Sequence, residues 1–501
     1  MNAHDLPARA LEQRGIDRSL KRDSAATLGE QLAARFADRI QQRGLQPGAR
    51  LPSVRECARL HGVSPSTVVA AYDQLQAQGL VEAQRQRGFF VRELPVARSA
   101  TPARAPTAAL SVNALPAPVD ATALIRGMFQ GRQGHVGPGL GTLPEPWLDK
   151  ALIERALRRT LPHAADALRY GDPAGDPSLR QALSRRLDGE LGIAADTGQI
   201  VTTLGATHAL DIVARTLLQP GDAVLVDEPG WAVEFARLTR LGMRLLPVPR
   251  GPNGPDLAVM QALVTEHRPR LYATVSVLHN PTGQSLSLAT AHQVLKLADA
   301  HDLLIVEDDT YAWLAPPHAP RLAALDGLQR TIYVSGFSKI LAPNWRVGYV
   351  AAAPALAERF IDTKLLMTLT SPALLERAVA WCLDQGLLRR HAERVVQRLD
   401  GARQRVLRLA TEAGCTFVTP PQGLFGWLDT GVDTDQLAIR LAEQGWLVAP
   451  GSLFHARRAP STLMRVNFAS SQEAAFWHSF VAARRALLQG STTRSRGSAE
   501  T

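Results

Sequence analysis

The segment from residue 333 to residue 349 holds a lysine and an arginine whose spacing suits a particular covalent chemistry. Lys339 stands behind a small polar turn, and Arg346 follows it seven residues later. A lysine amine can form an imine with an aldehyde, and a guanidinium can bind a phosphate carried by the same molecule. An exposed lysine after a turn would look the same in isolation, so the interpretation depends on groups elsewhere in the chain.

Two further segments carry groups that could bind a cofactor with an aldehyde and a phosphate. Gly205, Ala206 and Thr207 join an apolar strand to an amphipathic helix, where backbone amides and a hydroxyl can bind an anion. Asp308 closes another apolar strand, and Tyr311 follows it three residues later. Acids at a strand end are also common in metal and Mg²⁺-nucleotide sites, and turns of small residues occur in many α/β proteins.

Three isolated residues could complete the site. Asn280 stands in the turn His-Asn-Pro-Thr-Gly and can donate to a phenolic oxygen, and Trp231 can stack on a flat ring. Arg465 can form a bidentate pair with a substrate carboxylate. Each also has an ordinary structural alternative: a turn residue, a core tryptophan and a surface ion pair.

Together these groups meet the four requirements of pyridoxal 5′-phosphate chemistry. The requirements are a lysine for the imine, an anion site for the phosphate, an acid facing the pyridine nitrogen and a donor to the phenolic oxygen. Lys339 is the candidate lysine, and Asp308 is the acid that would hold the ring nitrogen protonated. Such a lysine is expected in a closed, cationic pocket that destabilises its ammonium form. The sequence therefore predicts a pyridoxal phosphate site and no metal site.

A second pattern lies near residue 50. Thr27 opens an amphipathic helix with a Thr-x-x-Glu capping box, Ser53 opens a short helix in the same way, and Ser64 caps a third with Pro65 behind it. Gly79 ends the third helix, and two short apolar strands flank the basic turn Arg-Gln-Arg-Gly. This order predicts a winged helix-turn-helix, whose third helix enters the major groove of DNA.

The residues expected to face DNA lie on the last two helices and the wing. They are Arg55, Ser64, Ser66, Thr67, Arg85 and Arg87. Residues 1–104 hold 16 Lys and Arg against 10 Asp and Glu, in a chain of formal charge +10. Concentrated positive charge favours a polyanionic partner, here double-stranded DNA. A helical protein-interaction module with solvated arginines would share the same periodicity.

Composition changes along the chain suggest five segments. We interpret them as an N-terminal arm (1–23), the winged helix-turn-helix (24–93), a Pro/Ala-rich linker (94–118), the cofactor-binding domain (119–489) and a disordered tail (490–501). Strands alternate with helices in the fourth segment, which predicts an α/β fold with a mainly parallel sheet. The expected strands are 199–203, 223–226, 270–276, 303–307 and 331–334.

The apolar content and the cysteines of the chain indicate where the protein is located. The chain is 46% hydrophobic and 20% charged, and no apolar run approaches the roughly 18 residues that span a bilayer. Its three cysteines are widely spaced and odd in number, which argues against a disulfide framework. A cytoplasmic protein without a membrane partner is therefore expected.

Residues 25–93, approximately, resemble a known family. Leu-Gln-Pro-Gly-Ala-Arg-Leu-Pro-Ser-Val-Arg-Glu from Leu45, continuing through Gly-Val-Ser-Pro-Ser-Thr-Val-Val-Ala-Ala-Tyr-Asp-Gln-Leu, resembles the DNA-binding domain of GntR-type bacterial regulators. The resemblance implies that Arg55, Ser64, Ser66 and the wing contact an operator. The family commonly has Arg where this chain has Pro65, so one phosphate or base contact is absent here.

Residues 120–485 resemble a second family. The ordered set Gly-Ala-Thr, Trp, Asn-Pro-Thr-Gly, Asp-x-x-Tyr, Ser-Lys, Arg and a distal Arg is similar to fold-type I aminotransferases of the aspartate aminotransferase superfamily. This implies a large domain with a mostly parallel seven-stranded sheet, a small α+β domain and a homodimer with active sites at the interface. It also implies that Ser338 and Arg346 bind the cofactor phosphate and that Tyr170 reaches the phosphate of the partner subunit.

One position departs from that second family. Gly336 stands where relatives often carry Ser or Thr, so one phosphate hydroxyl is absent unless Ser335 replaces it. The same glycine excludes the Ser-x-x-Lys arrangement of certain hydrolases.

The combination of both halves resembles the MocR-type subgroup of GntR regulators. It implies a pyridoxal phosphate-dependent transcriptional regulator whose aminotransferase-like domain senses the cofactor, or an amino acid or B6 vitamer as effector. An active aminotransferase with an accessory DNA-binding head is the alternative, and residual transaminase activity is compatible with the residues present. A cofactor-scavenging store is a third possibility.

Overall fold

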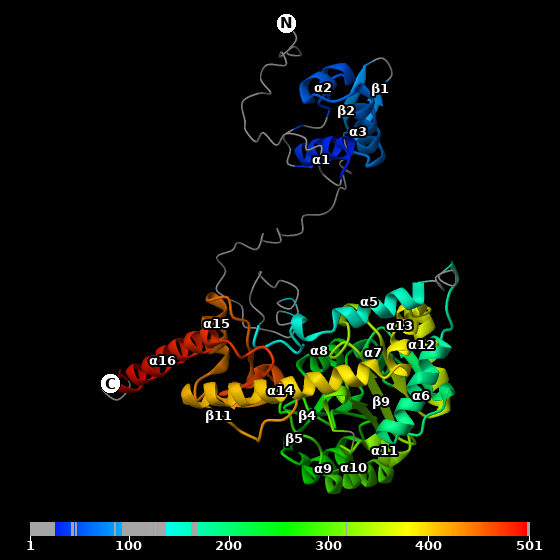
Figure 1. The fold of residues 1–501 in the computed structure, drawn as a ribbon. Helices are drawn as coiled ribbons and strands as arrows, with labels where there is room; N and C mark the ends of the chain where they lie inside the picture. The colour runs from blue at the N-terminus through cyan, green and yellow to red at the C-terminus, as the bar shows by residue number, and fades with distance from the viewer. Residues whose placement is uncertain are drawn as a thin grey trace. The chain divides into compact units, whose positions relative to one another are not determined.

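The computed structural model of the chain describes residues 26–41, 45, 48–84, 87–92, 122, 126, 137–161, 168–316 and 318–497. The chain divides into two compact units, Met1–Ser111 and Val112–Thr501, which we call the head and the body (Figure 1). The predicted arm, the predicted linker and Arg85 lie outside the described residues. No helix in the described ranges is long and apolar enough to cross a membrane.

The head is the winged helix-turn-helix that the sequence predicts. Its elements are α1 (Leu28–Gln41), α2 (Val54–His61), α3 (Pro65–Ala77), β1 (Val81–Gln84) and β2 (Gly88–Val91). The predicted capping box forms, because the Thr27 amide donates to Glu30 Oε2 at 2.7 Å and the Glu30 amide donates to Thr27 Oγ1 at 3.3 Å. The strands β1 and β2 pair antiparallel as the wing.

Tyr72 on α3 ties the head together. Its side chain is fully buried, and its hydroxyl donates to the Pro52 carbonyl at 2.8 Å. Its ring contacts those of Phe36 on α1 and Phe89 on β2, with centroids 5.8 and 4.9 Å apart. One side chain thus fixes α3 against the other helices and the wing, so the opposite face of α3 is left for contacts outside the head.

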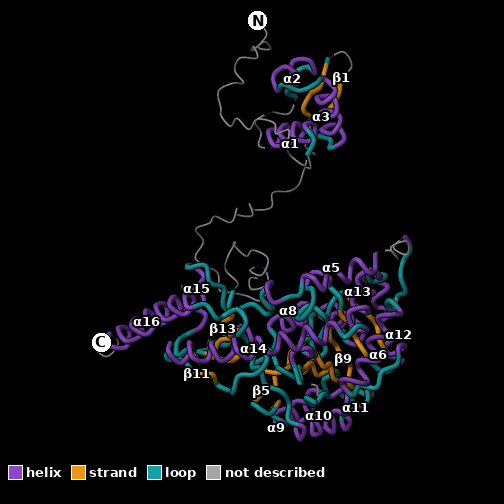
Figure 2. The backbone as a smooth tube through the Cα atoms, in the orientation of Figure 1, coloured by secondary structure: helices purple, strands orange, loops and turns teal. Residues whose placement is uncertain are grey.

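An eight-stranded sheet forms the centre of the body (Figure 2). Its strands run in the order β3, β10, β9, β8, β7, β4, β5 and β6. The bounds are β3 (Ile200–Thr203), β4 (Ala223–Glu228), β5 (Arg244–Gly251), β6 (Gly254–Pro255), β7 (Leu271–Thr274), β8 (Leu304–Asp308), β9 (Thr331–Gly336) and β10 (Gly348–Ala351). Neighbours from β5 to β9 pair parallel, and β10 pairs antiparallel with β3 and β9. All five predicted strands are confirmed, and the two-residue β6 is added to the seven implied.

Helices cover both faces of this sheet. They are α7 (Ala206–Leu217), α8 (Ala232–Arg240), α9 (Leu257–His267), α10 (Leu288–Ala300), α11 (Leu322–Asp326) and α12 (Pro354–Thr368). In β4, Val224 and Val226 pack with α7, α8 and α12, whereas Ala223 and Leu225 pack with α9, α10 and α11. Successive strand residues point to opposite faces, so a continuous apolar run serves two cores.

The rest of the body builds a second, smaller sheet with its helices. Its strands, in the order β11, β12, β14 and β13, are β11 (Thr416–Phe417), β12 (Phe425–Asp429), β14 (Leu463–Asn467) and β13 (Ala449–Pro450). The other helices are α5 (Lys150–Thr160), α6 (Pro177–Leu191), α13 (Ala373–Asp384), α14 (Leu387–Glu412), α15 (Thr434–Glu443) and α16 (Ala474–Gly497). Short 3₁₀ helices are η2 (Glu145–Trp147), η4 (Thr197–Gln199), η5 (Ala312–Leu314), η6 (Pro343–Trp345) and η7 (Gly451–Phe454).

A segment near the start of the body packs against its last strand, and the final helix is long. Asn467 Nδ2 donates to the carbonyls of Leu140 and Thr142, both at 2.8 Å, so the segment that enters the body lies against the strand that carries Arg465. Helix α16 runs to Gly497 and therefore extends into the segment for which the sequence predicts a disordered tail. No proline interrupts the sequence between the start of α16 and that glycine.

The loop before α6 is held by a close backbone approach at Gly175. Its φ is +111°, and a Cβ at this position would collide with the hydroxyl of Thr202 on β3. Lys364 Nζ donates to the Pro173 carbonyl at 2.8 Å from the other side. This loop follows Tyr170, so its packing determines the position of that tyrosine on the surface of the body.

We predict that Gly175→Ala lowers the free energy of unfolding of the body by about 2 kcal/mol or more, because it adds both a collision and an unfavourable φ. All eight tryptophans of the chain lie between residues 147 and 477, so urea unfolding followed by tryptophan fluorescence reports on the body.

Gly189→Ala on α6 is the matched control, since nothing lies within 4 Å of its added Cβ. Alanine is favoured in a helix by about 1 kcal/mol over glycine, so this variant should unfold at higher urea. An unchanged midpoint for Gly175→Ala would contradict the packing described here.

Candidate functional site

The predicted cofactor residues converge on one edge of the large sheet. Carboxyl ends of parallel strands meet at the same edge, where ligands bind in open α/β sheets. Gly205 follows β3, Trp231 follows β4, Asn280 follows β7, Asp308 ends β8 and Lys339 follows β9. Residues separated by more than 130 positions in the sequence are therefore brought together by the strand order alone.

Lys339 is partly buried among other charged groups. Its Nζ lies 6.0 Å from the ring centroid of Tyr311. Burial lowers the pKa of Lys339 to about 8, and the nearby guanidiniums of Arg465 and Arg346 act in the same direction, while Asp308 opposes them. A substantial fraction of neutral, nucleophilic amine is therefore present near neutral pH.

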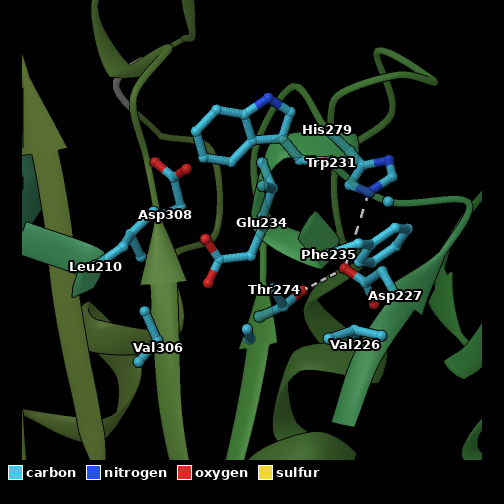
Figure 3. Close-up of a pocket in the computed structure, with 13 residues that line it drawn as sticks. Leu210, Val226, Asp227, Trp231, Glu234, Phe235, Thr274, His279, Val306 and Asp308 are labelled. Atoms are coloured by element: carbon cyan, nitrogen blue, oxygen red, sulfur yellow. Dashed lines mark hydrogen bonds and ion pairs between the residues drawn. The ribbon is translucent and has the colours of Figure 1, made fainter. Parts of the chain in front are cut away.

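Asp308, whose charge acts on this lysine, lines a pocket together with Trp231 (Figure 3). The Thr310 amide donates to Asp308 Oδ1 at 3.0 Å, and the Thr310 hydroxyl donates to the same oxygen. Burial raises the pKa of Asp308 to about 6, the Thr310 hydrogen bonds oppose that shift, and the Glu234 carboxylate adds to it. The second oxygen of Asp308 accepts no hydrogen bond from the described residues, so this acid can accept a proton donor from a ligand in the pocket.

A buried network fixes the turn that carries Trp231. Asp227, at the end of β4, accepts hydrogen bonds from Arg250 Nη1 and Thr274 Oγ1, both at 2.7 Å, and from the Tyr272 hydroxyl at 2.5 Å. His279 Nε2 lies 3.8 Å from the same carboxylate, and burial holds its pKa well below the usual value. The network restrains the two turns that contribute Trp231 and Asn280 to the site.

Arg465 is buried on β14 without a carboxylate partner among the described residues. Its Nη1 donates to Asn280 Oδ1 at 2.8 Å and its Nη2 to the Gly139 carbonyl at 2.5 Å. The guanidinium carbon lies 4.5 Å from the centroid of Phe425, and burial lowers the pKa of Arg465 to about 10. Its Nε has no hydrogen-bond partner in the described part of the chain. A buried guanidinium with spare donors favours an anionic ligand.

The amide of Asn280 has a defined orientation. Because its oxygen accepts from Arg465, its amide nitrogen is free to donate elsewhere. Tyr311 is buried against Phe425, and burial raises its pKa, so its hydroxyl remains a donor at ordinary pH. A Cβ at Gly141 would lie 3.8 Å from both the Tyr311 hydroxyl and Arg465 Nη2, so this glycine borders the two polar groups.

The residues predicted to bind an anion lie where α7 begins. Gly205 precedes Ala206 with φ +81°, and a Cβ at Gly205 would collide with the guanidinium of Arg346. Arg346 donates to Ser338 Oγ at 3.0 Å and to the Leu204 carbonyl at 3.1 Å. Free amides at a helix N-terminus beside a guanidinium are suited to phosphate.

The hypothesis that Ser335 replaces the missing hydroxyl is not supported by its orientation. Ser335 Oγ is buried and donates to the Asp309 carbonyl at 2.8 Å. Its neighbour Gly336 lies on the other face of β9, where a Cβ would stand 3.5 Å from the Ala206 amide nitrogen. Adjacent strand residues point in opposite directions, so Ser335 cannot take the place of a side chain at position 336.

Tyr170 does not line the pocket of its own chain. Its side chain is 80% exposed on the surface of the body. The neighbouring Gly171 lies next to Ser371 and Ala373, so the loop is anchored while the tyrosine projects outward.

The predicted DNA-facing residues lie on the head. They differ in exposure and in how many hydrogen bonds they already form within the head. Arg55 and Ser66 are exposed, and Arg87 is exposed with its guanidinium 5.7 Å from the Phe90 ring. Ser64 accepts from the Thr67 amide at 3.2 Å and shares a 2.8 Å hydrogen bond with the Thr67 hydroxyl. Ser64 and Thr67 therefore use part of their hydrogen-bonding capacity to cap α3, which leaves less of it for DNA.

Sequence reasoning missed Glu234, which is buried and lines the pocket with Asp308. Both its oxygens accept from Arg237, at 3.1 and 2.5 Å. Its position three residues after Trp231, one helical turn away, was the available signal, because such residues share a helix face.

Comparisons with known proteins agree with this geometry. Residues 147–476 match the family described as aminotransferase class I and II, and residues 28–91 match the bacterial regulatory proteins of the gntR family. The chain is 30% identical to the probable rhizopine catabolism regulatory protein MocR of Rhizobium meliloti, over 77% of this chain and 78% of that protein. It is 28% identical to the uncharacterized HTH-type transcriptional regulator YdcR of Escherichia coli, over 88% of this chain and 94% of that protein.

Solved structures show the same fold for the body. The multiple substrate aminotransferase from Thermococcus profundus matches with a TM-score of 0.68 at 25% identity, covering 76% of this chain and 97% of that one. The α-aminoadipate aminotransferase LysN from Thermus thermophilus matches with a TM-score of 0.67 at 25% identity, covering 73% and 95%. This chain therefore belongs to the aminotransferase class I and II family, as a MocR-like GntR regulator with an aminotransferase-like body.

We predict that Arg465→Gln raises the pKa of Lys339 above about 8, because it removes a positive charge that disfavours the ammonium. Only the neutral amine reacts with an aldehyde, so the pH midpoint of that reaction should move upward. Reductive methylation with formaldehyde over a pH series, read by mass spectrometry of the Lys339 peptide, measures this midpoint.

The shift should be partial, since burial remains the larger cause. Arg158→Gln, which removes an exposed guanidinium paired with Glu154 on α5, serves as the control and should leave the midpoint unchanged. A lower or equal midpoint in Arg465→Gln would argue against the electrostatic assignment.

Proposed function

We propose that the body binds pyridoxal 5′-phosphate through Lys339, and that an amino acid or B6 vitamer in this site controls the binding of the head to an operator. The observation that carries the proposal is the meeting of a depressed-pKa lysine, a strand-end acid and a buried guanidinium without a carboxylate partner among the described residues. Each of these is costly to bury, and a ligand with an aldehyde, a basic ring and an anionic group offsets all three costs.

The donor set fits this cofactor. The pocket beside Asp308 is bounded by Trp231, which can cover a flat ring and exclude water from it. Gly205 and Arg346 form a phosphate cradle that any larger residue at 205 would fill. When bound, the cofactor supplies an aldehyde that condenses with primary amines and a ring that withdraws electrons.

Each side chain then has a defined task. Asp308 would accept a hydrogen bond from the protonated ring nitrogen, and its carboxylate form, populated above its pKa of about 6, is the form that does so. Asn280 and Tyr311 donate to the phenolic oxygen, and the amides of Ala206 and Thr207 bind the phosphate. Arg465 binds the carboxylate of an amino-acid-type ligand, with its other donors held by Asn280 and the Gly139 carbonyl.

A homodimer completes this arrangement. Tyr170 is 80% exposed, Leu168 and Leu366 are 89% and 91% exposed, and Leu369 is 48% exposed. Apolar side chains at this level of exposure favour a protein partner, which we take to be a second copy of the chain. Tyr170 would then serve the phosphate site of the partner subunit, and two-fold symmetry would present two heads to a repeated operator.

Regulation requires the ligand to bind one arrangement of the heads better than another. A preference of about 1 to 3 kcal/mol is typical for such coupling. The head has its own buried core and complete caps, which supports a DNA-binding role in preference to an enzyme with an accessory head. Because the operator is chromosomal DNA, the proposed place of action is the cytoplasm.

The two halves of the proposal can be separated by paired variants. Lys339→Ala should abolish borohydride-stable attachment of pyridoxal phosphate and leave the DNA-binding surface intact. Arg55→Ala should retain the cofactor and weaken binding to the DNA upstream of the protein's own coding sequence by about tenfold at fixed salt. Absorption spectroscopy after gel filtration and fluorescence anisotropy measure the two properties.

Borohydride-stable attachment of the cofactor in Lys339→Ala would contradict the lysine assignment, and equal DNA binding by Arg55→Ala would contradict the head assignment. Steady turnover of an amino acid with a keto acid at ordinary enzyme rates would favour the aminotransferase alternative.

Shared active sites predict complementation between two defective chains. Tyr170→Ala should lower cofactor affinity, because the phosphate site of the partner subunit loses a hydroxyl donor. Lys339→Ala should abolish covalent attachment of the cofactor. A mixed dimer of the two has one site with both Lys339 and the partner's Tyr170, so it should recover one high-affinity site per dimer. Titration of co-expressed, differently tagged chains measures this recovery. Full affinity of Tyr170→Ala alone would show that the tyrosine serves no partner site.

A further inference from the structure

The exposed face of α3 carries no positive charge. Between Arg59 and Arg85 the sequence contains no lysine or arginine. In the first two turns of α3 the exposed residues are Pro65, Ser66, Val69 and Ala70. A helix that enters the major groove with such a face differs from the common arrangement, in which Arg or Lys binds O6 and N7 of guanine.

Hydroxyl donors on this face are also few. The hydroxyls of Ser64 and Thr67 bond to each other at 2.8 Å as part of the α3 cap. Ser66 shares a 2.8 Å hydrogen bond with Ser64, although its side chain is exposed. The start of α3 therefore offers mainly apolar surface to a base edge.

Val69 is the most prominent part of that surface. It is 43% exposed, whereas the adjacent Val68 is fully buried in the head core. Ser66, Val69 and Asp73 are spaced by three and four residues, so they lie on one face of the helix. The carboxylate of Asp73 is exposed on this face and would repel phosphates, which confines close contact to the first two turns.

Positive charge in the head is placed elsewhere. Arg55 and Arg59 are exposed on α2, and Arg87 is exposed on the wing. Contacts from such positions to phosphates orient a protein on DNA without reading its sequence. Orientation and base reading are thus divided between different elements of the head.

We infer that Val69 reads the 5-methyl group of a thymine in the major groove. The operator half-site opposite α3 is therefore specified by thymine, and no guanine contact from α3 is required. Apolar side chains recognise thymine by this methyl group, the one apolar group that a base presents in the major groove. This inference rests on the proposed DNA-binding function and adds the identity of the base and of the residue that reads it.

The test begins with the full-length protein and a pool of random-sequence DNA duplexes. Repeated selection at fixed salt yields bound duplexes, and each thymine in the common half-site is then replaced singly by uracil. Uracil keeps the base pairing and removes only the methyl group. At one position, uracil should weaken binding about fourfold, the factor that corresponds to one buried methyl-sized group.

The decisive measurement combines this replacement with two variants. In Val69→Ala the uracil penalty at that position should disappear, because non-additivity identifies the contacting pair. In Leu60→Ala, which trims another exposed apolar residue of the head, the penalty should persist whatever the overall affinity. Circular dichroism of each variant checks that the helices remain folded.

Three results would overturn the inference. The first is that uracil has no effect on wild-type binding at any position. The second is that the uracil penalty persists in Val69→Ala. The third is that the half-site opposite α3 requires guanine in place of thymine. Failure to enrich any duplex would refute the proposed DNA-binding function itself, and this result is distinct from the other three.

Discussion

The candidate site depends on the burial of two cations, Lys339 after β9 of the large sheet and Arg465 on β14 of the small sheet. Burial lowers the pKa of both Lys339, to about 8, and Arg465, to about 10. Removing charge from water is unfavourable, so these groups remain in place because one hydrophobic core holds the backbone that carries them. That core includes Phe337 and Ile340 beside Lys339, and Met464 and Val466 beside Arg465. Arg465 keeps two hydrogen bonds, to Asn280 and Gly139, and has no carboxylate partner among the described residues. A site built this way is selective for anionic, proton-accepting ligands.

Close backbone packing forms the opposite end of the site. Gly205 and Gly348 approach so closely that a Cβ on Gly348 would lie 2.6 Å from the Gly205 carbonyl carbon, and Arg346 covers the same point. The sheet order places β10 between β3 and β9, which is what brings these residues together. The proposed phosphate cradle is therefore a consequence of topology, and the absence of a side-chain hydroxyl at Gly336 leaves the backbone and guanidinium groups of that cradle in place.

The head and the body solve different electrostatic problems. The body concentrates charge in a buried site, whereas the head exposes Arg55 and Arg59 on α2 and Arg87 on the wing and leaves α3 without positive charge over its exposed face. Tyr72 anchors α3 from within the head core, so the orientation of the reading face is determined by packing inside the head alone. In the proposed homodimer, control of DNA binding by the body would therefore act on the placement of two heads and not on their internal structure.

Local chemistry in the sequence was enough to predict the elements and to name candidate cofactor residues that the structure places at one edge of the large sheet. Capping residues at Thr27, Ser53 and Ser64 mark helix starts, and continuous apolar runs mark strands buried on both faces, because both signals act over a few residues. Directions of side chains and contacts between distant segments needed the tertiary structure. It turned Ser335 toward Asp309, placed Glu234 beside Asp308, and left Val69 exposed next to buried Val68. Those outcomes depend on strand order and on which helix face is covered, and neither is encoded in neighbouring residues alone.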